Sequence, residues 1–169
     1  MIVTDYPDAD LIDNLTHNIS TCEHLPRPAN IWAEGYLWGA AISPLIAHLP
    51  APDPTARPSR FDVLILADLL FNHSEHGKLV RTVRTALART SASKALVFFT
   101  PYRPWLLQKD LAFLDLARQD AAEDGHGRLH VEKIMEKVLP DVMFEKDPGD
   151  ERLRRTVFGY ELTWADLRL

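Results

Sequence analysis

The sequence of 169 residues is poor in the features that place a protein in a membrane or outside the cell. Its one cysteine, Cys22, cannot form a disulfide within the chain, which fits a reducing compartment. No apolar run approaches the roughly 20 residues that span a bilayer, and the first residues lack the regions of a signal peptide. The net charge of -5 argues against nucleic acid as a partner and suits a basic protein segment. We therefore expect a cytosolic or nuclear protein, with the cytoplasm as its location.

Apolar residues alternate between strand-like runs and helical spacing along the chain. The expected strands are Met1–Asp5, Ile31–Leu37, Phe61–Ala67, Lys94–Thr100, Leu129–Val138 and Arg155–Trp164. Helical spacing predicts helices over residues 8–18, 74–89 and 107–117. The last two strands are expected to pair antiparallel. The sequence therefore predicts one domain, residues 1–169, with an α/β sheet that is mostly parallel and has one antiparallel strand.

Three local signals refine this pattern. Phe61–Ala67 has the composition of a buried strand. Ser43 and Pro44 are expected to supply the N-cap and the first residue of a short helix. Four prolines between residues 50 and 58 mark an irregular connector.

The run Phe61–Ala67 is followed directly by Asp68, and Phe71 comes three residues later. Ligands of open α/β sheets bind at the carboxyl ends of the strands, so this acid and this ring mark a candidate ligand site. No glycine-rich loop precedes this point to hold a cofactor. Asn72 and Ser74 can cap the helix that follows, which leaves the Asp68 carboxylate for chemistry.

Six longer segments occur in one order along the chain: TDYPDADLIDNL, GYLWGA, FDVLILADLLFNHSEH, FFTPYRPW, MFEKDPGDE and RRTVFGYEL. Together they resemble the seven-strand class I methyltransferases. More closely, they resemble the fungal methyltransferases of the N-terminus and an adjacent lysine of elongation factor 1-alpha. The resemblance covers the chain from Val3 to about Trp164. It implies a Rossmann-like α/β sheet, S-adenosyl-L-methionine as cofactor and elongation factor 1-alpha as protein substrate.

The resemblance implies roles for five residues. Asp5 matches an acid that binds the ribose hydroxyls of the cofactor, a role that suits a carboxylate because it only accepts hydrogen bonds. Trp38 matches a tryptophan near the adenine, and Ala67 matches the residue beside the cofactor at the end of the fourth family strand. Asp68 and Phe71 match the Asp-x-x-aromatic motif that lines the amine channel. From the residues alone, an acid placed like Asp5 is more often a turn or cap residue than a ligand, and Trp38 is equally a core residue.

One part of the family pattern is missing. The family has a central first strand followed by Gly-x-Gly, whereas this chain begins at the second strand. A gap at the centre of a sheet leaves unpaired N–H and C=O groups, each costing roughly 1–3 kcal/mol. We therefore expect the chain to be an N-terminally truncated fragment; the alternative is a sheet that closes in a new way.

Other side chains near Asp68 have more than one interpretation. His73 and His76 flank Ser74 and Glu75, but they lack the spacing and companions of a metal site, so a first-turn helix surface is expected. Tyr102 and Trp105 follow the strand that ends at Thr100 and are expected at the same mouth of the sheet as Asp68. They either wall a substrate channel or cover the next helix.

The sequence leads to three hypotheses of function. The first is methyl transfer to a protein amine, with Asp68 orienting the amine. Phe71, with Tyr102 as a second candidate, would form apolar walls that favour the neutral form of the amine. The second is a catalytically incomplete remnant that only binds a partner protein. The third is methylation of a small molecule, as in nicotinamide N-methyltransferases.

Overall fold

The computed structural model describes residues 1–50, 59–120, 127–142 and 148–167. The chain divides into two compact units, Met1–Ser59 and Arg60–Leu169, and we describe each by itself. The single domain expected from the sequence stays a prediction. Most of the proline-rich connector lies outside the described residues, as does Asp147 of the loop before the last strand.

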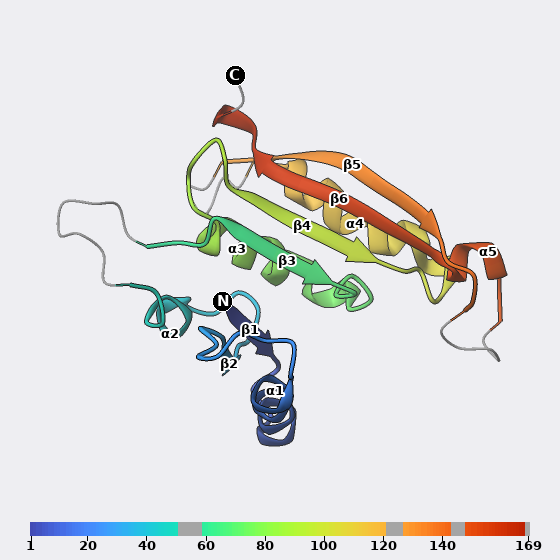
Figure 1. Cartoon of the computed structure of the whole chain (residues 1–169). Coiled ribbons are helices and arrows are strands. Elements are labelled where there is room, and N and C mark those ends of the chain that lie inside the picture. Colours follow the sequence, from blue (N-terminus) through green and yellow to red (C-terminus); the bar gives the residue numbers. More distant parts are fainter. Residues whose placement is uncertain (51–58, 121–126, 143–147, 168–169) are drawn as a thin grey trace. The chain divides into compact units, whose positions relative to one another are not determined.

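The first unit contains a two-stranded parallel sheet and two helices (Figure 1). Its elements are β1 (Ile2–Asp5), α1 (Ala9–Thr21), β2 (Trp32–Gly35) and α2 (Ser43–Ile46). Asp8 caps α1, because its side chain accepts a hydrogen bond of 3.0 Å from the Asp10 amide. The helix predicted over residues 8–18 is confirmed and extends further, to Thr21.

The short helix α2 begins one residue earlier than the sequence predicts. Ile42 is its N-cap, and the Ile42 carbonyl accepts hydrogen bonds from the amides of Leu45 and Ile46 at 2.9 and 3.0 Å. Ser43 is therefore already inside the first turn, and no side chain caps the helix. The prediction of Ser43 as N-cap is wrong, while Pro44 does lie in the first turn.

The second unit is a four-stranded sheet in the order β3-β4-β6-β5 with two long helices. Its elements are β3 (Val63–Ala67), the 3-10 turn η1 (His73–Glu75), α3 (His76–Ala86), β4 (Lys94–Phe99), the 3-10 turn η2 (Pro104–Leu106), α4 (Leu107–Arg118), β5 (Leu129–Val138), α5 (Glu151–Arg154), β6 (Thr156–Trp164) and the 3-10 turn η3 (Ala165–Leu167). The predicted strands and helices of this region are thus confirmed, with small differences at their ends.

The strand directions match the predicted mixture. β3 and β4 are parallel, and β6 is antiparallel to both β4 and β5. Three strands therefore run one way and β6 alone runs the other way. The chain is a mixed α/β protein, as predicted.

Both α3 and α4 lie behind the sheet in Figure 1, on one face of it. The core between the layers contains Val83, Val97, Phe113, Leu162 and Trp164, none more than 1% exposed. Among the described residues, no helix is both long enough and apolar enough to cross a membrane.

The strand β3 is less buried than its composition predicts. Leu66 is 5% exposed, whereas Val63 and Ile65 are 49% and 65% exposed. β3 is one of the two edge strands of this sheet, and its alternate side chains point to the face opposite α3 and α4. The expectation of a strand buried on both faces is therefore wrong for this strand.

Candidate functional site

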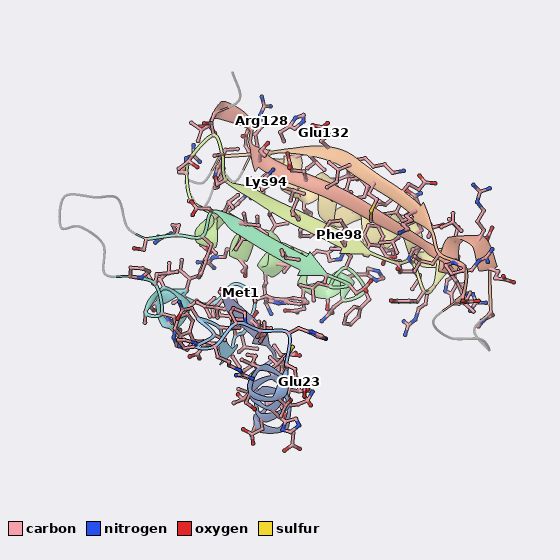
Figure 2. The ribbon with its side chains drawn as sticks, in the orientation of Figure 1. Met1, Glu23, Lys94, Phe98, Arg128 and Glu132 are labelled. Atoms are coloured by element: carbon pink, nitrogen blue, oxygen red, sulfur yellow. The ribbon has the colours of Figure 1, made fainter. Side chains whose placement is uncertain are left out.

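Asp68 links the carboxyl ends of β3 and β4. Its amide donates to the carbonyl of Phe98, which is labelled in Figure 2, at 2.8 Å. Its Oδ1 accepts a hydrogen bond of 2.9 Å from the amide of Thr100. Asp68 has a φ of 53°, in the left-handed region, where aspartate is one of the few residues tolerated without a large cost. Side chain and backbone thus hold the carboxylate at the mouth of the two strands.

The second carboxylate oxygen of Asp68 faces Tyr102. The Tyr102 hydroxyl donates to Oδ2 across 3.3 Å. Burial, together with the nearby Asp68 charge, raises the pKa of the Tyr102 phenol, so the hydroxyl stays a donor at neutral pH. Asp68 is exposed, and a carboxylate can accept further hydrogen bonds beyond these two. The carboxylate is therefore oriented by its neighbours and still accessible to a ligand with N–H donors.

A pocket of about 260 Å³ opens at this mouth. Its lining residues come from the ends of β3 and β4 and from η1, η2 and α4: Asp68, Leu70, Phe71, His73, Phe99, Thr100, Tyr102, Arg103, Leu106 and Asp110. The structure therefore brings Asp68, Phe71 and Tyr102 together, as expected. Phe71 is 68% exposed, which leaves its ring available at the pocket edge. Trp105 is not among the lining residues, and it lies against Gly149.

The pocket lining also contains a histidine–aspartate pair. His73 Nε2 lies 2.6 Å from Asp110 Oδ1, and Asp110 is 7% exposed. Burial raises the pKa of the Asp110 carboxyl, and the hydrogen bond from His73 opposes this effect. Asp110 is not among the site residues predicted from the sequence. Its signal in the sequence is an acid within the apolar stripe of α4, three residues after Leu107 and four before Leu114.

The expectation that both histidines lie on a helix surface is wrong. His76 is 3% exposed, and its Nε2 is 2.8 Å from the Leu70 carbonyl, to which it donates. Its ring meets Phe113 edge-on, with centroids 5.7 Å apart. His76 thus holds the segment between Asp68 and Phe71 through the Leu70 carbonyl. In the part of the chain that the structure describes, no cluster of His, Cys, Asp or Glu has the geometry of a metal site.

The two cofactor residues expected in the first unit lie at one end of its sheet. Asp5 is paired with Gly35 at the ends of β1 and β2, and Tyr36 continues the pairing by donating to the Asp5 carbonyl at 2.8 Å. Trp38 follows in a turn closed by a hydrogen bond of 3.0 Å from the Ala40 amide to the Leu37 carbonyl. Gly39 has a φ of 79°, and a type II β-turn requires a positive φ of this size at its third position.

The chemistry of Asp5 fits a ligand with hydroxyl groups. Its side chain is exposed, and Oδ1 accepts a hydrogen bond of 2.7 Å from the Tyr6 amide. Oδ2 has no hydrogen-bond partner among the described residues and can accept from a hydroxyl. Asp5 and Trp38 thus lie in the first unit, and Ala67, Asp68 and Phe71 lie in the second.

Comparison with known proteins identifies close relatives over nearly the whole chain. No family model matches it. The chain is 46% identical over 168 residues to the protein N-terminal and lysine N-methyltransferase efm7 of Emericella nidulans, covering 98% of this chain and 61% of that protein. It is 46% identical to the enzyme of the same name from Neurospora crassa, covering 97% of this chain and 56% of that protein. It is 39% identical to that of Schizosaccharomyces pombe, covering 96% and 58%.

The chain thus spans about three fifths of the length of these relatives. The matches cover 96–98% of this chain and therefore extend into both units. They confirm the resemblance described above: the chain is a homologue of the fungal protein N-terminal and lysine N-methyltransferases.

Proposed function

We propose that this chain carries out S-adenosyl-L-methionine-dependent methylation of the N-terminal amine and an adjacent lysine of a protein. The names of the relatives support the reaction and the kind of acceptor. The observation that carries the proposal is the pocket in which Asp68 and Phe71 meet at the mouth of a sheet. Elongation factor 1-alpha is the acceptor that the sequence resemblance implies, and the cytoplasm is the proposed location.

Asp5, Trp38 and Ala67 are the residues that would hold the cofactor. Asp5 offers a carboxylate oxygen that has no partner in the part of the chain that the structure describes, and Trp38 offers an aromatic surface at the same end of its sheet. The single antiparallel strand β6 beside β4 supports the assignment of the second unit to a class I methyltransferase sheet. The expected absence of the family's first strand stays a prediction. When bound, the cofactor supplies a methyl group on a sulfonium.

Asp68 is proposed to orient the acceptor amine. A neutral amine has N–H donors for the carboxylate and a lone pair for the methyl carbon. In-line displacement depends on this alignment more than on a strong base. Thr100 and Tyr102 hold the two oxygens of Asp68, so the direction of the hydrogen bond to the amine is fixed in advance. The exposed ring of Phe71 would provide an apolar wall that favours the neutral amine.

The test begins with binding. Calorimetry of the chain with S-adenosyl-L-methionine is expected to detect binding, and Asp5→Asn is expected to weaken it. Absence of binding would instead favour the second hypothesis, a chain that only binds a partner protein. Mass spectrometry of elongation factor 1-alpha and of nicotinamide after incubation with chain and cofactor separates protein methylation from small-molecule methylation.

The role of Asp68 is tested by exchange for asparagine. Asp68→Asn is expected to lower the rate of methyl transfer about 10- to 150-fold, the equivalent of roughly 1.5–3 kcal/mol for a hydrogen bond to a charged group. Asp62→Asn is the matched control, because Asp62 is an exposed acid just before the opposite end of β3. If Asp68→Asn methylates as fast as the wild type, the orienting role is wrong.

A further inference from the structure

The pair of His73 and Asp110 has no role in the function proposed above, although it lines the same pocket as Asp68. His73 lies in η1 and Asp110 in α4, so two separate elements bring them together. Asp110 is almost completely buried, and His73 is about a quarter exposed. A buried acid that holds a partly exposed imidazole at a pocket wall is the arrangement of an oriented proton acceptor.

The hydrogen bond determines which ring nitrogen is available. An ionised Asp110 can only accept, so His73 Nε2 carries the proton between them across 2.6 Å. The neutral imidazole then has its lone pair on Nδ1. Nδ1 has no hydrogen-bond partner among the described residues. His76 contacts the ring of His73 edge-on, with centroids 5.5 Å apart, and limits its rotation.

A protein amine arrives mostly as an ammonium ion. The ordinary pKa is about 7.7–8.0 for an α-amino group and about 10.4 for lysine, so a proton must leave before the nitrogen can attack. Asp68, held by Thr100 and Tyr102, is proposed to orient the nitrogen by accepting a hydrogen bond from it. A second group that removes the proton would complete the pocket.

We propose that His73, oriented by Asp110, accepts this proton from the substrate ammonium at Nδ1. The inference rests on the proposed methylation of protein amines and adds to it a residue that handles the proton. The group R–NH3⁺ gives one proton to the neutral imidazole and becomes R–NH2. The amine nitrogen then forms a bond to the methyl carbon of a sulfonium donor, and the carbon–sulfur bond breaks with its electron pair staying on sulfur. The imidazolium later loses its proton to solvent.

The charges around His73 suit this exchange. The titratable and charged groups that face it or line its pocket are Asp68, His76, Tyr102, Arg103 and Asp110. Asp110 stabilises an imidazolium through a direct hydrogen bond. The nearby charge of Arg103 acts to lower the pKa of the Asp110 carboxyl, and so it favours the ionised form that accepts from His73.

The pH dependence of methyl transfer distinguishes a proton acceptor from a structural residue. His73→Gln places an amide near the position of Nε2, which keeps a donor for Asp110 but removes Nδ1. This variant is expected to lower transfer to the N-terminal amine of a peptide about 10²-fold at pH 7. The gap to the wild type is expected to narrow as the pH rises past about 8, because the amine then loses its proton without help. His130→Gln, on β5 and outside the pocket, is the matched control.

A second measurement is independent of turnover. In the histidine NMR spectrum of the chain, the His73→Gln variant assigns the signals of His73 among the seven histidines. A peptide with a free N-terminal amine is expected to shift the His73 signals, and the same peptide with an acetylated N-terminus is expected to leave them unchanged. Urea unfolding of His73→Gln shows whether the fold is retained.

The outcomes separate this inference from the proposed function. Loss of transfer by His73→Gln at pH 7 with recovery at high pH, together with amine-dependent NMR shifts, supports the inference. Equal loss at all pH values, or transfer like that of the wild type at pH 7, overturns it and leaves the methyltransferase proposal intact. If the wild type binds S-adenosyl-L-methionine but methylates the peptide at no pH, the proposed function fails and the inference fails with it.

Discussion

The two units of the chain differ in how much apolar surface each encloses. In the second unit, residues from all four strands and from α3 and α4 are almost completely buried. In the first unit, only Tyr36, Ile42 and Leu45 are buried apolar residues, as far as the structure describes it. No residue of α1 is buried, and its apolar stripe of Ile12 and Leu15 is half-exposed.

The larger core of the second unit supports the candidate amine site. Burial of apolar surface is the main favourable term in folding, at about 25 cal/mol per Å². The Asp68 pocket is built on the unit with the larger core, so its geometry is fixed by packed strands. Asp5 and Trp38 are built on two short strands and a turn. A pair of strands is at best marginally stable alone. We therefore expect Asp5 and Trp38 to be held less firmly than the residues of the amine pocket.

Truncation of a core side chain is expected to have the largest effect on the free energy of unfolding. Leu162→Ala removes a side chain that is 0% exposed and is expected to cost about 2–5 kcal/mol of unfolding free energy in the second unit. Leu45→Ala is the matched truncation in the first unit and is expected to cost less, because α2 has only four residues and few buried neighbours. Native-state hydrogen exchange in increasing urea measures both, since it reports opening for each segment.

The wild-type amides of the first unit are expected to exchange at lower urea than those of the second unit. Leu45→Ala is expected to leave exchange in the sheet of β3, β4, β5 and β6 unchanged. If both truncations shift all amides by the same amount, the chain unfolds as one cooperative body and the comparison is wrong.

The next effect concerns two glycines that lie at close approaches in the two units. A Cβ at Gly159 would lie 2.8 Å from the Phe98 ring and 2.9 Å from Met135 Cβ, and a Cβ at Gly35 would lie 2.9 Å from Pro7 Cα. Gly159→Ala is expected to cost about 1–3 kcal/mol, as overpacking of a core does. Gly35→Ala meets backbone and is expected to lower the stability of the first unit alone. Urea unfolding and hydrogen exchange measure the two, and a Gly159→Ala effect near zero would mean that Phe98 can move aside.

Much of the fold follows from the sequence. The strand predicted over Leu129–Val138 is confirmed at both ends, and its antiparallel pairing with β6 is confirmed. These runs are long and bounded by polar segments, so local pattern determines them. The burial of β3 did not follow, because exposure of Val63 and Ile65 depends on which strand lies at the edge. Periodicity along one strand carries no information on its neighbours.

The candidate site was predictable only where it follows a strand. Asp68 and Phe71 were found because an acid after an apolar run is visible in the sequence. His73 and Asp110 are 37 residues apart, and their hydrogen bond depends on how α4 packs beside η1. The burial of His76 depends on the same packing. Such pairs are created by tertiary structure, and neither residue marks the other in the sequence.

A third effect is a pH dependence confined to the second unit. Burial raises the pKa of Asp110 above 3.8, so the folded state binds this proton more tightly than the unfolded chain does. The protonated Asp110 carboxyl therefore stabilises the folded state at a pH below its pKa in the unfolded chain. This stabilisation is lost as the pH rises through the pKa of Asp110 in the folded state. Relative to Asp110→Asn, which cannot titrate, the wild type is expected to lose stability as the pH rises from about 4. Urea unfolding of both proteins across a pH series measures the difference, and a difference that grows in favour of the wild type would contradict the sign.

The smallest expected effect is a gain in stability. Gly77 lies in the first turn of α3, and a Cβ there would meet nothing within 4 Å. Gly77→Ala removes the extra freedom that glycine has in the unfolded chain, and it is expected to stabilise the second unit by about 0.5–1 kcal/mol. Because the change touches no residue of the first unit's core, hydrogen exchange there is expected to stay as in the wild type. If Gly77→Ala slows hydrogen exchange equally in both units, the two units share one unfolding transition. The contrast between a well-packed amine pocket and less firmly held cofactor residues would then be wrong.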